Sequence, residues 1–330
     1  MKKKYPGIIC FAFISILVSS LSLDCSKKST EPVLLPSWSS IIRDYEYQQR
    51  TFYDLGYFID FTSGDSIVEI KLFKSNFEIN NDNGENASPL GIAYIDPSDT
   101  LALYPEGSFL RRFQEIDPND YSVERKQHWI RFFQSLGKTD IMAAFYVLKH
   151  SNSTYDTVGY LKDSCIVSEN YICMRLKLIK PDTPKPTDYT WEYEWKNVYY
   201  LATKDIPRER FGLQIFKGPV NAENIYADLI TQEGTLYLQI FGLDQLDSDG
   251  NAHPDGIVDY RQMDFDLGYL FFPNRHPFAP YPNPTYTGNP GDTLKEMVGS
   301  IYNSNQIQDQ VEQSKYYICT KIYTWQFSSR

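Results

Sequence analysis

The amino-acid sequence predicts an all-β protein made of antiparallel, β-sandwich-like modules with few short helices. Aromatic residues make up 15% of its 330 residues, and large amphipathic rings favour half-buried pleated sheets. Apolar and charged residues alternate with the two-residue period of strands that bury one face. These alternating segments are 67–74, 173–180 and 190–196. Turn-forming clusters separate the strands, as in antiparallel sandwiches; they lie at 80–88, 150–154, 181–187 and 247–256.

Fuller apolar runs and two helical patterns complete the expected elements. The runs at 141–148 and 235–241 have strand length and predict two further strands. Helical spacing at 292–303 and 306–314 predicts two short helices that cover the sheets.

The segment 173–180 also supports a prediction about burial. Leu176 and Ile179 cannot face the same side of a regular strand. We therefore expect Leu176 and Leu178 to be buried unequally.

A faint internal repeat divides the chain into two related β units, 45–193 and 194–330. In each copy an aromatic-rich strand leads into an alternating strand, an Asp-Tyr pair and a further apolar strand. The segments are 50–59, 68–74, Asp120-Tyr121 and 129–133 in the first copy, and 196–206, 212–217, Asp259-Tyr260 and 268–272 in the second. Two copies of one β unit would give this order; the alternative is a chance alignment of aromatic-rich strands.

The first residues predict export. Three lysines at 2–4 precede an apolar stretch at 8–18 and a few small residues. This is the layout of a secretory signal peptide, which we place at 1–24, and the apolar stretch is short for a membrane span.

Cys25 lies shortly after the apolar stretch and begins a polar tether, 25–44. Lipoprotein signals have this arrangement, so we expect Cys25 to be acylated and to anchor the protein in a membrane. The expected location is the cell envelope, as an outer-membrane lipoprotein facing either the periplasm or the surface. The alternative is ordinary cleavage near Ser20 or Ser22, which leaves Cys25 as an unmodified thiol.

The folded part contains three cysteines, Cys165, Cys173 and Cys319. Cys165 and Cys173 flank a short segment that fits a hairpin turn, and a disulfide could join them. The alternative is three separate buried thiols, since a core of this size needs no covalent support.

Charge and motif content exclude some functions. The net charge is −10 and the pI is near 5.0, which argues against nucleic-acid binding because such proteins need a basic face. The four histidines lie in no nucleophile or metal-ligand signature, and the sequence contains no phosphate-binding glycine loop. We therefore expect a protein that is not an enzyme and needs no organic cofactor.

The densest polar segment is the loop 244–259. Oxygen donors, the ligand type that Ca²⁺ prefers, stand at alternating positions in Asp247, Asp249 and Asn251, and glycines allow tight turns. Asp255 and Asp259 supply two further donors. Counted from Asp247 as the first ligand, glycine (Gly250) falls at the fourth position, whereas an EF-hand loop has glycine at the sixth, so the loop is not an EF-hand. The alternative to a structural calcium site is a solvated turn closed by its own Asx caps.

Several segments resemble, in order and spacing, the N-terminal region of the SprA family of cell-surface secretion and motility proteins. The strongest matches are 241–246 and 255–260, followed by 268–273 and 276–278, which are similar to its G-L-D-R-L-N, P-D-G-x-x-D, G-x-I-I-F-P and x-P-F-G elements. Weaker matches at 109–113, 120–123, 141–147, 195–201 and 315–318 extend the resemblance over about 45–325.

The resemblance implies a non-catalytic, exported structural or protein-interaction module related to SprA-type gliding and type IX secretion machinery, with envelope or secretion-system proteins as partners. SprA proteins are very large outer-membrane proteins, and this chain matches one β module of them, so a pore function is not implied. The alternative function is a glycan-binding surface lipoprotein, because exposed Tyr and Trp rings also stack on sugars.

Overall fold

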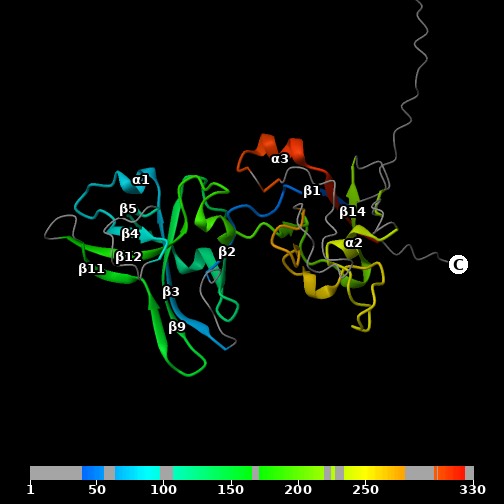
Figure 1. Ribbon diagram of the computed structural model, residues 1–330, viewed down its shortest axis with the longest axis horizontal. Helices are drawn as coiled ribbons and strands as arrows, with labels where there is room; N and C mark the ends of the chain where they lie inside the picture. Colours follow the sequence, from blue (N-terminus) through cyan, green and yellow to red (C-terminus); the bar gives the residue numbers. More distant parts are fainter. Residues whose placement is uncertain are drawn as a thin grey trace, which may run out of the picture. The chain divides into compact units, whose positions relative to one another are not determined.

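The computed structural model describes residues 39–55, 64–96, 107–165, 171–218, 224–226, 234–278, 301–302 and 304–323. They belong to one compact unit, Trp38–Arg330. Strands in several sheets dominate this part of the chain, together with three short α-helices, so the all-β prediction is confirmed (Figure 1). The helical elements are α1 (Phe77–Asn80), α2 (Tyr237–Ile240), α3 (Ile307–Gln313), η1 (Pro118–Asp120), η2 (Tyr189–Tyr193), η3 (Arg208–Arg210) and η4 (Tyr260–Gln262).

Several sequence predictions fall outside the described residues. They are the signal peptide 1–24, Cys25 and most of the helix expected at 292–303. The last part of the predicted tether is a strand, β1 (Ser40–Arg43), because it pairs with β17 (Tyr316–Ile322). The helix expected at 306–314 is confirmed as α3.

The largest sheet has eight strands and is built by the first half of the chain. Its main order is β5-β4-β12-β9-β3-β6, with β10 paired to β9 and β11 paired to β12. The strands are β3 (Ser66–Ser75), β4 (Leu90–Tyr94), β5 (Phe109–Arg112), β6 (Gln114–Glu115), β9 (Ile141–Lys149), β10 (Tyr155–Val158), β11 (Tyr160–Cys165) and β12 (Tyr171–Lys180). One pair, β4 with β12, is parallel, whereas the sequence predicted antiparallel pairing throughout.

Both faces of the central strands are buried in this sheet. Side chains of β9 alternate between two hydrophobic clusters, Met142 and Tyr146 on one face and Ala143 and Phe145 on the other. A strand covered on both faces needs apolar residues at every position, which explains the continuous apolar run of β9.

The prediction of unequal burial for Leu176 and Leu178 is wrong. Both are buried, at 0% and 2% exposure, and both pack in the same cluster. Ile179 packs on the opposite face, which is also covered. Unequal burial would require a strand with one solvated face, whereas β12 lies between β4 and β9 and is covered by hydrophobic clusters on both faces.

Two smaller three-stranded sheets share one topology. One has the order β2-β8-β7 and the other β13-β16-β15, so that in each the last strand in sequence lies between the first and the middle one. The strands are β2 (Phe52–Asp54), β7 (Tyr121–Glu124), β8 (Trp129–Phe132), β13 (Val198–Tyr200), β15 (Met263–Asp264) and β16 (Tyr269–Phe271).

Equivalent hydrogen bonds connect the strands of the two small sheets. Leu55 N donates to His128 O in one, and Leu201 N donates to Gly268 O in the other, both at 2.8 Å. His128 and Gly268 both have positive φ, 61° and 73°. Each also donates its N–H to the residue four positions earlier, at 2.8 Å. The two small sheets therefore match each other in backbone detail, and the division of the chain into two related units stays a prediction.

The remaining sheet, β1-β17-β14, with β14 (Phe211–Lys217), packs with α2 in the largest hydrophobic cluster. The strand predicted at 235–241 is wrong, because Tyr237–Ile240 form α2. Leu243 N donates to Leu238 O (2.9 Å) and Gly242 N to Gln239 O (3.0 Å), with Gly242 at φ 75°. This is the Schellman end of a helix, which requires a left-handed residue. The strand predicted at 190–196 is also wrong over most of its length, because Tyr189–Tyr193 form η2.

Candidate functional site

The acidic loop predicted to bind calcium begins directly after α2. Asp244, the first residue of the loop, follows the Schellman turn and is fully buried. Its two carboxylate oxygens accept the N–H groups of Asp255 (2.9 Å) and Gly256 (3.0 Å). Burial raises the pKa of Asp244, and these hydrogen bonds oppose the rise. Asp244 thus connects the two ends of the loop.

Asp259 fastens the loop from its other end. Its side chain is almost fully buried, at 2% exposure, and its carboxylate accepts the N–H groups of Leu246 (3.0 Å) and Gln245 (3.3 Å). Arg261 approaches the same carboxylate at 3.4 Å. Buried backbone N–H groups in a loop need such acceptors, because they have no strand partner.

The outer half of the loop is an Asx turn. Asp247 accepts the N–H groups of Asp249 (3.0 Å) and Asn251 (2.8 Å), and the Asn251 amide also contacts it, at 3.1 Å. The Asn251 side chain and these N–H groups lower the pKa of Asp247. Asp255 accepts the N–H of Ile257 at 2.9 Å.

Only part of the predicted calcium set comes together. Asp247 and Asn251 touch, whereas Asp255 and Asp259 each cap another stretch of backbone. Among the residues that the structure describes, no group of three or more His, Cys, Asp or Glu side chains converges as metal ligands. The Asx-capped turn describes this arrangement, and calcium binding stays a prediction.

A small apolar pocket opens beside the acidic loop. It has a volume of about 210 Å³ and lies between the loop and η4. Leu246 and Val258 form apolar walls, and Ile257 and Tyr260 stand at it with 52% and 54% of their surface exposed. Large apolar side chains exposed together around a hollow are typical of a contact surface.

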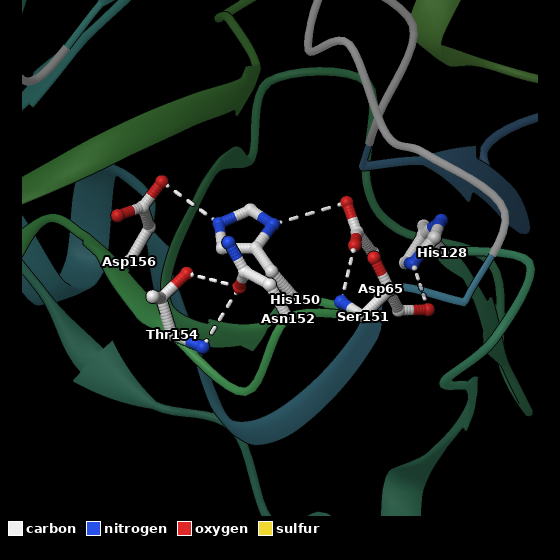
Figure 2. Close-up of polar contacts among 7 residues, drawn as sticks. All are labelled: Asp65, His128, His150, Ser151, Asn152, Thr154 and Asp156. Carbon is white, nitrogen blue, oxygen red and sulfur yellow. Dashed lines mark hydrogen bonds and ion pairs between the residues drawn. The ribbon is translucent and has the colours of Figure 1, made fainter.

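A second polar cluster, missed by the sequence analysis, surrounds His150 (Figure 2). Its Nδ1 lies 3.1 Å from the buried carboxylate of Asp65, and its Nε2 lies 2.9 Å from Asp156, which is exposed. The hydrogen bonds that the ring donates to Asp156 and Asp65 raise the pKa of His150. Asp65 also accepts the N–H of Ser151 at 3.1 Å.

This cluster connects three elements rather than activating a nucleophile. Asp65 directly precedes β3, His150 lies in the turn after β9, and Asp156 belongs to β10. Both ring nitrogens of His150 face carboxylates, so in the described part of the chain no hydroxyl or thiol hydrogen-bonds to this ring. His128, whose pKa burial lowers, donates from Nε2 to Asp65 O at 3.2 Å and extends the connection to β8.

An aromatic and arginine-rich face forms where the two repeated sheets meet. Phe52 of β2 packs against Trp195, Tyr269 and Phe271 at ring separations of 5.5–6.0 Å. We call this set the aromatic face; it consists of Phe52, Trp129, Arg131, Phe133, Trp195, Tyr269, Phe271 and Arg275.

Two arginines lie across the rings of the aromatic face. The guanidinium of Arg275 is 4.1 Å from the Trp195 ring centre and pairs with Asp54 at 2.5 Å. Arg131 lies 4.7 Å from the Tyr269 ring and 5.6 Å from Phe133, which is 55% exposed. Cation–π contacts of this kind are attractive and favour these positions of the arginines over the rings. Phe52 is buried at the centre of the face, and Phe133 is its exposed edge.

A larger pocket, of about 620 Å³, is open and polar. It lies beside η1 and the end of β8, with Phe132 and Leu136 among the apolar residues of its lining. Its polar side chains are Lys74, Gln114, Glu115, Asp117, Asp120, Gln134, Ser135 and Asp140.

The structure describes the backbone at the predicted disulfide between Cys165 and Cys173, but not the two side chains. β11 and β12 form the expected antiparallel hairpin, with Cys165 opposite Tyr171 and Cys173 opposite Asp163. The two cysteines are thus diagonal rather than directly opposed, and their side chains lie outside the described part, so the disulfide stays a prediction. Cys319 is a buried free thiol.

Comparison with known proteins adds no family assignment, since no family model and no curated protein matches the chain. Within the described residues, none of the helices has the length and apolar character that a membrane crossing requires.

Proposed function

We propose that this chain is a non-catalytic, exported module of the cell envelope that binds other envelope or secretion-system proteins. The aromatic face carries the proposal. Trp, Tyr and Arg are the residues most enriched at the energetic centres of protein interfaces, and here they lie together at a junction of two sheets, with Phe133 exposed at its edge.

The arrangement of the face suits binding more than chemistry. Its arginines are already stacked on rings and, for Arg275, paired with a carboxylate. Ordered side chains lose little conformational entropy when a partner docks. The predicted signal peptide, the predicted lipidation of Cys25 and the resemblance to SprA proteins together favour an envelope partner and an anchor in the outer membrane.

Site-specific crosslinking tests the proposal. A benzoylphenylalanine placed at Phe133 in the full chain, expressed in its own cells, should yield crosslinked adducts with barrel or secretion components after irradiation. The control carries the same group at Phe77, which is 82% exposed on α1 and lies outside the aromatic face. Equal adducts from both positions, or none from Phe133, would contradict the proposal.

A second candidate function, glycan binding, is favoured by the open polar pocket beside η1. Its mixed carboxylates, amides and lysine could hydrogen-bond to sugar hydroxyls, and its volume of about 620 Å³ suits a ligand of oligosaccharide size. Retention of the wild-type protein on immobilised envelope polysaccharide, lost in an Asp120→Ala, Gln134→Ala double variant, would support this function instead.

A further inference from the structure

The duplicated sheets each carry a pocket at a corresponding place. The open polar pocket includes Pro118 and Asp120 of η1, the turn that precedes β7. The apolar pocket includes Tyr260 and Arg261 of η4, the turn that precedes β15. Because β7 and β15 are equivalent in the repeat, the fold presents two hollows next to equivalent turns, one polar and one apolar.

The apolar pocket has the size of a site for one side chain. Its volume of about 210 Å³ is below the roughly 300 Å³ at which pockets for whole small ligands begin. Ile257 and Tyr260 are exposed at it, and Val258 forms a buried wall. Covering these apolar groups with a fitted apolar side chain would remove them from water, which is favourable.

The charge around the pocket favours positively charged residues next to the partner side chain that enters it. Asp247, Asp255 and Asp259 all contribute to the lining, against one cation, Arg261, which is paired with Asp259. The hydrogen bonds that lower the pKa of Asp247 keep that carboxylate charged at neutral pH. The surroundings are therefore net negative and complement a positively charged partner.

The walls are fixed before any partner arrives. Asp244 holds the backbone of Asp255 and Gly256, and Asp259 holds that of Leu246. A loop connected in this way need not be ordered on binding, so little of the contact energy is lost.

We propose that this pocket receives one aliphatic or aromatic side chain of a partner protein, presented between lysine or arginine residues. The inference rests on the proposed interaction function and adds the chemistry of the partner segment. The occupant is a basic, apolar peptide segment rather than a metal ion, because the carboxylates do not converge and the space between them is apolar.

Methyl NMR titration of the folded, exported chain tests the pocket directly. The probe is the peptide acetyl-Gly-Lys-Leu-Lys-Gly-amide, compared with versions in which Ser replaces Leu or Glu replaces both Lys residues. Saturable shifts of the Leu246, Ile257 and Val258 methyls are expected with the first peptide, and at least tenfold weaker binding with the other two.

Matched variants separate the pocket from general effects. Ile257→Gln should weaken binding at least tenfold, and Asp255→Asn about threefold with a smaller salt dependence. The control is Ile307→Gln, which removes an isoleucine of similar exposure, 58% against 52%, on α3, and it should bind as the wild type does.

Each outcome supports or overturns the inference. Equal binding of the Lys and Glu peptides, or no shift at Leu246, Ile257 and Val258 with any peptide, overturns it, as would shifts produced by maltohexaose alone. Crosslinking at Phe133 is independent of the pocket, so adducts there together with unshifted pocket methyls would leave the proposed function standing while this inference fails.

Discussion

Replacing Gly268 with alanine should destabilise the protein by more than the ordinary strain of a left-handed residue, because the backbone of the small sheet leaves no room for a Cβ. Gly268 has φ +73°, and an added Cβ would lie 1.7 Å from the carbonyl oxygen of Thr203. That oxygen is backbone, so no rotamer change relieves the overlap. The strands β13 and β16 must move apart, which weakens the Leu201 N–H bond to Gly268 O.

Gly250→Ala is the matched control. Gly250 has φ +85° with nothing within 4 Å of its added Cβ, so it carries only the left-handed strain, about 1–2 kcal/mol, partly offset by about 0.4–1 kcal/mol of reduced chain entropy in the unfolded state. Gly268→Ala adds the displaced backbone and a weakened buried hydrogen bond, for a total of about 3–5 kcal/mol.

Urea unfolding followed by tryptophan fluorescence measures both variants, because Trp129 and Trp195 report on the junction of the two sheets. At about 2–4 °C per kcal/mol, Gly268→Ala should also lower Tm by about 10 °C and Gly250→Ala by about 3 °C or less. Equal destabilisation by the two substitutions would refute the account of Gly268.

Three further predictions concern charged groups. Asp156 and Asp65 raise the pKa of His150 above its ordinary 6.5, so the stabilisation by protonated His150 is complete below about pH 6.5 and is lost as pH rises through the raised pKa. The Tm difference between wild type and His150→Gln should therefore shrink from pH 6 to pH 8.5. A Tm difference that is constant over that range would count against the cluster. Burial lowers the pKa of Lys180 from 10.5 to about 8, so between these pH values the unfolded chain binds a proton that the folded chain does not, and the free energy of unfolding should rise from pH 8 to pH 9.5. Lys180→Met should reduce this rise with pH. An unchanged rise would show that Lys180 keeps its ordinary pKa. Asp247, Asp255 and Asp259 already accept backbone N–H groups, so melting curves in calcium and in chelator should superimpose and Asp249→Ala should leave Tm nearly unchanged. A rise in Tm of several degrees with calcium, abolished by Asp249→Ala, would instead establish the metal site.

The sequence predicted the class of fold because alternation and turns are local signals. The run at 141–148 identified β9, and helical spacing identified α3. The apolar run at 235–241 was misassigned because a helix buried all round and a buried strand have the same composition over seven residues. Gly242 directly after the run was the available signal, since a left-handed residue there ends a helix.

The candidate sites were predicted less well, because they depend on contacts between distant segments. The acidic loop was visible as a local cluster, and its alternative as an Asx-capped turn describes the hydrogen bonds that form. The His150 cluster was not visible, since Asp65 is 85 residues from His150 in sequence. The aromatic face likewise needs β2 and β16 side by side, and no spacing within either segment indicates that.

The repeat explains how one architecture comes to hold different sites. Both copies require a left-handed residue before the last strand, and one uses His128 while the other uses Gly268. Histidine tolerates this backbone at some cost, but its ring reaches Asp65 and so links the small sheet to the His150 cluster. Glycine offers no such link and instead allows the close approach of Thr203. The same backbone position therefore serves a side-chain connection in the first copy and tight backbone packing in the second. This asymmetry leaves the polar cluster with the first copy, while the acidic loop and its apolar pocket precede β15 in the second.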